Sequence, residues 1–215
     1  MIGFGEGLSD YSLILNLFLL GLLPFLIAGG TCFIKFNIVF SLVKNAIGIQ
    51  QIPTNITTNA VALMMTLFVM YPVYNQIFTY VSENKVQYED ASSVDDFLTE
   101  GLSSYKEYLV RYSDENLVEF FQNLNNPEEK IKNQAFSFVA YMPAYALTEI
   151  KSAFEIGFYL YLPFIIIDLV VSNILLALGM MMMSPVTISL PIKLILFVAI
   201  DGWSRISQGL ILQYF

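Results

Sequence analysis

The sequence predicts an all-α membrane protein, in which four hydrophobic helical segments, kinked or broken, flank an acidic helical insertion between the second and the third. Composition is the first reason: 56% of the 215 residues are hydrophobic, 13% are charged, and the mean hydropathy is +0.64. Soluble domains usually carry about twice that share of charge. The second reason is that the apolar residues lie in runs of about 20, the length of a membrane-spanning helix. Prolines and glycines inside these runs predict the kinks.

The composition also excludes several kinds of function. The chain has no His, and Cys32 is its only Cys, which excludes His-based general-base catalysis, Cys–His nucleophiles, the common zinc sites and an intramolecular disulfide. The net charge of −8 argues against a nucleic-acid partner. The sequence has no G-x-x-x-x-G-K-[ST] loop, so the energy for any transport must come from another protein. We therefore expect no catalytic residue, no cofactor and no metal.

The first hydrophobic segment covers residues 11–34, which are all uncharged. As a helix it would reach roughly 36 Å, enough to cross a hydrocarbon core of about 30 Å with some tilt. Pro24 and the Ala28-Gly29-Gly30 triplet predict a kink in its second half. Glu6 and Asp10 precede it without any basic residue, unlike a secretory signal, so we expect a retained span.

A polar connector with Lys35 and Lys44 is expected next, and a second hydrophobic segment then covers residues 60–80. Pro72 predicts a kink in that segment, and the tyrosines around its end suit the membrane interface. Together these parts predict an N-terminal hydrophobic hairpin over residues 1–82.

The insertion, residues 83–135, holds 12 acidic and 5 basic residues. Its apolar residues recur at helical spacing and predict two helices, the first N-capped by Ser92 or Ser93 and the second by Ser113. Each helix would have one apolar face and one acidic face. We therefore expect the insertion to pack against itself or against a neighbour.

The last part, residues 136–215, is expected to form a C-terminal hydrophobic hairpin with one segment over residues 156–183 and another over residues 188–211. A charge at membrane depth is costly unless it is paired or faces water. We expect the charges in this part to serve assembly or pairing, within or between subunits, ahead of any direct chemistry. They are Glu149, Lys151, Asp168, Lys193 and Asp201, the last two being two helical turns apart on one predicted helix.

The basic residues predict the orientation. Lys35 and Lys44 fall in the expected first connector, and the short link between the last two segments is expected to carry Lys193. Short basic loops stay in the cytoplasm. Four crossings would then place both termini and the acidic insertion on the outer side of the membrane.

One stretch between the last two segments is Gly179-Met180-Met181-Met182-Met183-Ser184-Pro185. Gly and Pro interrupt helices, so the methionines are expected at a turn or a broken helix in apolar surroundings. Thioether side chains are flexible and polarizable, and a ring of them from several copies would make an apolar constriction that excludes water. The plainer interpretation is a Met-rich patch that fills core or lipid-facing space.

The C-terminal part carries a series of motifs: Pro143-Ala144-Tyr145, Glu149-Ile150-Lys151, Ala153-Phe154-Glu155-Ile156-Gly157-Phe158, Tyr161-Leu162-Pro163-Phe164, Ile167-Asp168-Leu169-Val170, Gly179-Met180-Met181-Met182, Ile188-Ser189-Leu190-Pro191-Ile192-Lys193-Leu194 and Asp201-Gly202-Trp203. In this order they resemble the FliP/SctR family, the export-gate proteins of bacterial type III secretion systems, both flagellar and virulence-associated. The resemblance is looser over the first hairpin, and the acidic insertion carries no motif of the family.

This resemblance implies a mechanism. Family members assemble as about five copies into a helical cone around a narrow channel in the bacterial inner membrane. Their partners are small membrane proteins of the FliQ/SctS and FliR/SctT families, larger export-gate and switch components, membrane lipid, and unfolded secreted polypeptides. Met180, Met181 and Met182 would form the family's methionine gasket, which seals the channel until a substrate engages. Much of the assembly sits above the lipid plane, so neighbours as well as lipid would cover the apolar segments.

Two departures favour the virulence (injectisome) branch over the flagellar one. Thr54 stands where flagellar members usually carry a second Pro, and the chain shows neither their cleaved signal peptide nor their longer lead. Met183 extends the Met triplet into a more variable position, so the gate role is expected only of the three methionines before it.

Two other functions would use the membrane-depth carboxylates. A small proton- or ion-coupled transporter would use Asp168 as its ion site, although four spans without an internal repeat are unusually few. An intramembrane aspartyl protease would need Asp168 and Asp201 as a dyad, but the Gly-x-Gly-Asp pattern of such proteases is absent from the sequence. Replacing Asp168 with Asn would abolish turnover in either alternative and would disturb assembly in an export gate.

Overall fold

The structure is a computed structural model that describes residues 17, 21–22, 24–49, 51–84, 96–124, 134–180 and 182–215. All regular elements in these ranges are helical, which confirms the predicted all-α class. A short helix over Pro24–Gly30 comes first. It is followed by α2 (Phe33–Ile47), α3 (Asn55–Asn84), the π-helical turn η1 (Phe97–Gly101), α5 (Ser103–Tyr112), α6 (Glu115–Leu124), α7 (Gln134–Ala177), α8 (Pro185–Ala199), α9 (Gly202–Ile211) and the 3-10 turn η2 (Leu212–Tyr214).

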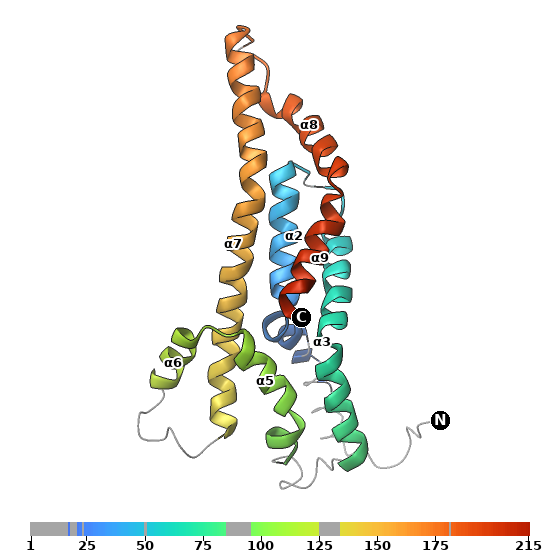
Figure 1. Ribbon diagram of the computed structural model, residues 1–215, viewed down its shortest axis with the longest axis vertical. Coiled ribbons are helices and arrows are strands. Elements are labelled where there is room, and N and C mark those ends of the chain that lie inside the picture. The colour runs from blue at the N-terminus through green and yellow to red at the C-terminus, as the bar shows by residue number, and fades with distance from the viewer. Residues whose placement is uncertain are drawn as a thin grey trace, which may run out of the picture.

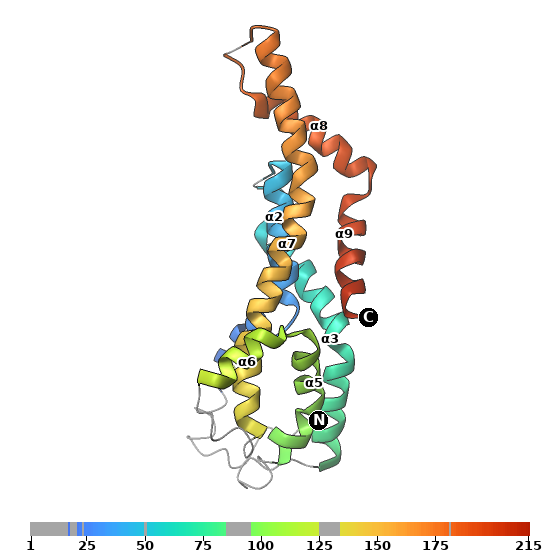
Figure 2. The ribbon, with the colours of Figure 1, turned by 60° about the vertical axis from the view of Figure 1, so that its left-hand side comes forward.

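The molecule is elongated, and α7 runs along most of its length (Figure 1). From the upper end of α7 the chain turns back into α8, and α9 continues downward toward the C-terminus. The short helices α5 and α6 lie at the end opposite the α7–α8 turn, as Figure 2 also shows. α2 packs against both α7 and α3, so it lies at the centre of the core.

By length and composition, α3 and the Ala140–Ala177 part of α7 can each cross a membrane. Two bent helix pairs would each add one crossing: Pro24–Gly30 with α2, and α8 with the helices that follow it. The described ranges therefore offer up to four spans. The last three overlap the predicted second, third and fourth segments, whereas the first lies further along the chain than the predicted residues 11–34 and includes the expected connector.

Lys35 and Lys44 differ most from the sequence prediction. They do not lie in a polar connector but in α2, where only 5% and 4% of their surfaces are exposed. Phe36 and Phe40 lie on the same helix, one turn apart, and are also buried. The Lys44 Nζ donates to Asn55 Oδ1 at 2.8 Å, which compensates part of the cost of burying it. The prediction of a basic cytoplasmic loop at these lysines is therefore wrong, and they give no support to the predicted orientation of the chain.

The kink predicted in the first segment is confirmed just after the Ala28-Gly29-Gly30 triplet, where the first short helix meets α2 at 76°. Thr31 Oγ1 donates to the Ile27 carbonyl at 2.6 Å, which satisfies one carbonyl at the break. The Tyr105 hydroxyl donates to the Gly30 carbonyl at 2.7 Å. A Cβ at Gly30 would clash with that hydroxyl, so glycine allows this close approach without a shift of the Tyr105 side chain.

In the insertion, η1 and α5 are separate elements, so the first predicted helix is interrupted. The cap of α6 is Asp114, whose Oδ1 accepts the Asn116 N–H at 3.0 Å. The predicted cap, Ser113, instead donates to a backbone carbonyl one turn earlier. The N-cap predicted at Ser92 or Ser93 lies outside the described residues.

The last predicted segment is two helices, α8 and α9, which meet at 59°. The bend falls at Asp201, which has φ 51°, an uncommon value for a residue with a side chain. Ser204 Oγ donates to Asp201 Oδ1 at 2.9 Å. Gly202 lies so close to the Phe197 ring that a Cβ there would clash. Lys193 and Asp201 therefore do not share one continuous helix, contrary to the prediction.

The core lies in the lower and middle parts of the molecule, where α7 and α2 approach closely at Gly157. A Cβ at Gly157 would overlap the Leu42 side chain, so this glycine sets the distance between the two helices. The larger buried side chains of this core are Phe36, Phe40, Met70, Tyr108, Leu109, Tyr145, Phe164, Phe197, Leu210 and Tyr214. The upper ends of α7 and α8 extend beyond it and expose most of their apolar side chains.

Candidate functional site

The methionine run forms the turn between α7 and α8. α7 ends in a Schellman motif, in which the Gly179 N–H donates to the Leu176 carbonyl at 3.0 Å. The Met180 N–H donates to the Leu175 carbonyl, also at 3.0 Å. Gly179 has φ +75°, which favours glycine, and α8 begins at Pro185, whose fixed φ suits the first helical position. The Gly and the Pro thus end one helix and begin the next, as the sequence predicts.

The described methionines of this run are exposed. Met182 is 101% exposed, Met183 43% and Met180 38%, and Met181 lies outside the described residues. The Met183 N–H donates to the Met180 carbonyl at 3.2 Å, so the run is a tight turn. This turn is the upper tip of the molecule in Figures 1 and 2, far from the core. The single chain leaves Met182 without cover and covers Met180 and Met183 only in part, so a neighbouring chain or lipid must supply the rest.

An ion pair joins the two arms of the α7–α8 hairpin below the methionine turn. The Lys193 Nζ on α8 lies 2.6 Å from Asp168 Oδ2 on α7 and also donates to the Ala46 carbonyl of α2 at 3.1 Å. The Lys193 side chain is 7% exposed and that of Asp168 is 42% exposed. Among the described residues, Asp168 Oδ1 and Ser189 Oγ are buried atoms without a hydrogen bond. Three helices therefore meet at this one lysine.

A second buried ion pair lies lower in the molecule, between α2 and α7. The Lys35 Nζ lies 3.1 Å from Glu149 Oε1, with side chains that are 6% and 2% exposed. The Tyr214 hydroxyl donates to Glu149 Oε2, and the Lys35 amine lies 4.7 Å from the centre of the Tyr214 ring. Gln213 Oε1 accepts from Lys35 at 3.4 Å, and the Tyr112 hydroxyl donates to the Tyr214 carbonyl at 2.9 Å. This cluster fastens the end of the chain to its core.

Lys151 and Asp201 lie at the surface. The Lys151 Nζ is 3.4 Å from Asp114 Oδ2, and the lysine side chain is 71% exposed. Hydrogen bonds from the backbone and side chain of Asn116, with help from Lys151, hold the pKa of Asp114 below its usual value. Asp201 accepts a hydrogen bond from Ser204 and is not among the described ion pairs.

The structure thus brings Asp168 and Lys193 together and keeps Asp201 apart from Lys193. Sequence analysis missed Lys35, the buried partner of Glu149. A signal for its burial was present, because apolar residues recur around it at intervals of three and four residues. No sequence signal could pair Lys35 with Glu149, since the two lie far apart along the chain.

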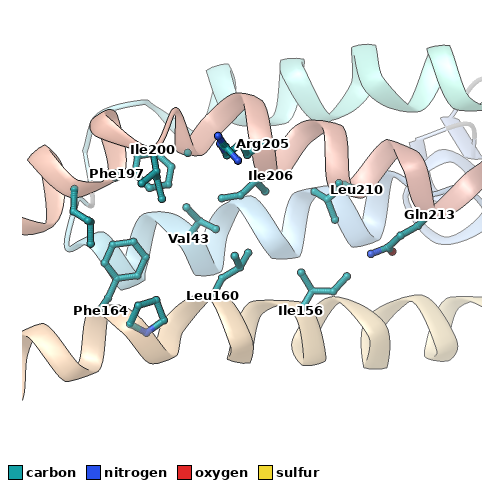
Figure 3. Close-up of a pocket in the computed structure, with 14 residues that line it drawn as sticks. Val43, Ile156, Leu160, Phe164, Phe197, Ile200, Arg205, Ile206, Leu210 and Gln213 are labelled. Atoms are coloured by element: carbon teal, nitrogen blue, oxygen red, sulfur yellow. The ribbon is translucent and has the colours of Figure 1, made fainter.

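A groove of about 460 Å³ lies between α7 and α9. Ile156 and Leu160 line it from α7, and Ile206 and Leu210 from α9 (Figure 3). Arg205 lies on its α9 wall. In the part of the chain that the structure describes, no cluster of three or more His, Cys, Asp or Glu side chains could hold a metal ion.

Comparisons with known proteins cover nearly the whole chain. The model of the FliP family matches residues 16–210. The chain is 55% identical over 217 residues to the surface presentation of antigens protein SpaP of Salmonella typhi, covering 96% of this chain and 97% of that one. It is 44% identical over 210 residues to the Yop proteins translocation protein R of Yersinia pestis, with the same coverage. It is 38% identical over 200 residues to the harpin secretion protein HrcR of Erwinia amylovora, covering 91% and 92%.

Proposed function

Because this chain belongs to the FliP family, in its virulence-type (injectisome) branch, we propose that several copies of it surround a gated channel through which unfolded proteins cross the bacterial inner membrane. The chain is a component of a type III secretion export apparatus and is not an enzyme. Its apolar helices fit an inner-membrane protein. The single observation that carries the channel proposal is the exposed methionine turn at the tip of the α7–α8 hairpin.

Met180, Met181 and Met182 of each copy form the seal in this proposal. A closed seal must exclude water and ions, and an open one must conform to cargo side chains of changing shape. Methionine is unbranched and rotates about several bonds, so a cluster of methionines adapts to both demands. Branched Leu or Ile would fit one fixed shape, and a ring of charges would select cargo by sign.

The Asp168–Lys193 ion pair, which lies below the methionine turn, also supports this proposal. It ties α8 to α7 at 2.6 Å, and the bond from Lys193 to the Ala46 carbonyl ties both helices to α2. The tip is thereby carried by a hairpin whose arms are held together. In the assembly, this pair would fix the height and direction at which each methionine turn meets its neighbours.

The proposed assembly holds about five copies, with membrane proteins of the FliQ/SctS and FliR/SctT families and larger export-gate and switch components. Exposed apolar surface supports an assembly of this kind. Only 17% of the most apolar window of α7 is buried within the chain. A helix of 44 residues is also about 66 Å long, roughly twice the thickness of a hydrocarbon core. Lipid alone cannot cover this length, which supports cover by neighbouring proteins in addition to this chain's own helices.

We also propose that the acidic insertion lies on the periplasmic side. α3 ends and α7 begins next to the insertion, so the insertion lies on one side of the membrane whichever way the chain is oriented. The test is labelling in intact cells with a membrane-impermeant maleimide after Glu119→Cys, a surface position on α6. The periplasmic location predicts labelling without lysis, and the native Cys32 should add little background because it is buried. Labelling that requires lysis would reverse the orientation.

A photo-crosslinking experiment tests the channel proposal. Met182 is replaced by a benzophenone-bearing amino acid in the assembled apparatus, and a secreted substrate is trapped in transit. Because the turn would surround the cargo, we expect covalent adducts between this position and the substrate. The same replacement of Met64 on α3, which is 68% exposed, is the matched control and should give no substrate adduct. A trapped substrate that never crosslinks to position 182 would contradict the proposal.

A further inference from the structure

Two opposite charges in the hydrophobic helices form no ion pair with any residue that the structure describes. Glu155 lies in α7 and Arg205 in α9, and both are exposed. The ion pairs among the described residues are Lys35–Glu149, Lys151–Asp114 and Lys193–Asp168. An unpaired charge in a membrane-type helix is costly, so each of these two side chains calls for a partner outside its own chain.

Arg205 stands at an apolar groove. The α7–α9 groove, lined by Ile156, Leu160, Ile206 and Leu210, has a volume of about 460 Å³. Figure 3 shows Arg205 on the α9 wall of this groove, among apolar side chains. The groove therefore offers apolar surface together with one positive charge, and it suits an apolar surface that carries one negative charge.

Glu155 is the one negative charge on an exposed apolar face of α7. Phe158, Leu162 and Ile166 follow it at three, seven and eleven residues, which places all four on one face of α7. The three apolar side chains are 59%, 39% and 59% exposed. This α7 ridge (Glu155, Phe158, Leu162, Ile166) points away from α2, because the α7 residues that contact the core, such as Ala153, lie on the opposite face.

We propose that the α7 ridge of one copy lies in the α7–α9 groove of the next, and that Glu155 forms an ion pair with Arg205 of that neighbouring copy. This rests on the proposed assembly of several copies and adds the residues that join them. Ridge and groove are different surfaces of the same chain, so the contact is head-to-tail, the kind that closes into a ring. It covers apolar surface on both chains and removes both unpaired charges at once.

Other carboxylates in the hydrophobic helices fit Arg205 less well. Asp168 already pairs with Lys193, and Glu149 with Lys35. Asp201 precedes Arg205 by one helical turn, but its carboxylate accepts the Ser204 hydroxyl and lies at the positive end of α9. Glu83 has no ion pair among the described contacts either, but it lies in the last turn of α3. Glu155 is therefore the acid away from a helix end that the described ion pairs leave without a partner.

Charge reversal tests the ion pair. The full apparatus is made with Glu155→Arg, with Arg205→Glu, or with both, and the homo-oligomer is extracted in mild detergent and quantified by native mass. Each single reversal brings like charges together, so we expect about tenfold less assembled complex. The double reversal restores the opposite charges and should recover most of it. Glu107→Arg, an exposed position on α5, is the control and should assemble normally.

A crosslinking ladder tests the geometry independently of assembly yield. In a Cys32→Ala background, Glu155→Cys and Arg205→Cys are combined, and the complex is treated with a short bis-maleimide. A head-to-tail contact should allow successive chains to be crosslinked, which gives a ladder of covalent oligomers. Each cysteine alone should give no dimer, whereas a dimer from either one would mean that identical surfaces face each other and would overturn the proposal.

The remaining outcomes separate this inference from the proposed function. An intact homo-oligomer that is indifferent to both reversals and gives no ladder would overturn the ion pair and leave the channel proposal standing. A native chain that never forms a homo-oligomer would overturn the channel proposal itself. If Arg205→Glu disrupts the complex while Glu155→Arg does not, the ion pair is wrong and Arg205 binds another anion, such as a lipid phosphate.

Discussion

At the scale of single residues, two lysines in this protein are buried against carboxylates: Lys35 with Glu149, and Lys193 with Asp168. The attraction in a buried pair roughly offsets the cost of taking both charges out of water. Removing one partner leaves the other charge buried alone, which costs about 3–5 kcal/mol. The buried lysines are therefore positions where one substitution should have a large effect.

Glu149→Gln should destabilise the protein strongly, because it leaves the Lys35 ammonium buried without a counter-charge. A loss of about 3–5 kcal/mol lowers Tm by about 10 °C for a chain of this size, measured as thermal unfolding in mild detergent. The matched control is Lys151→Gln, which breaks an ion pair whose lysine is 71% exposed and should cost less than about 1 kcal/mol. Equal effects of the two changes would contradict the role assigned to the buried pair.

Asp168→Asn separates an export gate from a transporter. In the gate, the change leaves Lys193 with the Ala46 carbonyl alone, the hairpin loosens, and assembled complex falls by about threefold or more. Secretion should fall in the same proportion, so that secretion per assembled complex changes little. Both are measured in the same cells, by native mass and by secreted substrate. An intact complex without any secretion would instead point to proton or ion coupling at Asp168.

At the scale of helices, sequence and structure agree where a local rule decides the outcome. The end of α7 at Gly179 and the start of α8 at Pro185 follow from backbone preferences that need no tertiary information. The helical insertion likewise follows from apolar periodicity. The methionine turn could thus be located from the sequence, including the residues that bracket it.

The sequence could not specify the elements that tertiary contacts decide. Lys35 and Lys44 led to the prediction of a polar connector where α2 lies, and only the carboxylate and amide acceptors brought by α7 and α3 allow these lysines to be buried. The bend at Asp201 uses a left-handed conformation that sequence rules assign to glycine. The first error comes from contacts between residues distant in the chain, and the second from a backbone conformation that is uncommon for a residue with a side chain.

Gly157→Ala tests the close approach of α7 and α2. A Cβ at this position would overlap Leu42, so the two helices must separate or Leu42 must move, at a cost of about 1–3 kcal/mol in unfolding free energy. Thermal unfolding in detergent measures the loss. Gly209→Ala on α9 is the matched control, because nothing lies within 4 Å of its added Cβ. Ala favours a helix by up to about 1 kcal/mol, so this control should be neutral or slightly stabilising, and a Gly157 variant equal to it would contradict the packing argument.

At the scale of the whole molecule, the fold is a compact lower body with a hairpin that extends from it (Figures 1 and 2). The body buries the ion pair of Lys35 together with a cluster of aromatic side chains that includes Phe36, Tyr108 and Tyr214, whereas the hairpin exposes apolar residues along its length. Such a surface is stable only when something apolar covers it. Much of the apolar surface of the single chain is not buried, and the chain belongs to a secretion family. Both findings support an assembly in which copies cover one another and bring their methionine turns together.

Ion permeability of the assembled complex tests this account most directly. The complex carrying Met180→Ala, Met181→Ala and Met182→Ala is purified, its mass is shown to equal that of the native complex, and both are placed in vesicles for a potassium-flux measurement. The account predicts a tight native complex and a leaking variant, because Ala is too short to close the passage. Met64→Ala, an exposed methionine on α3, should stay tight. A triple variant with unchanged mass and unchanged permeability would contradict the methionine seal.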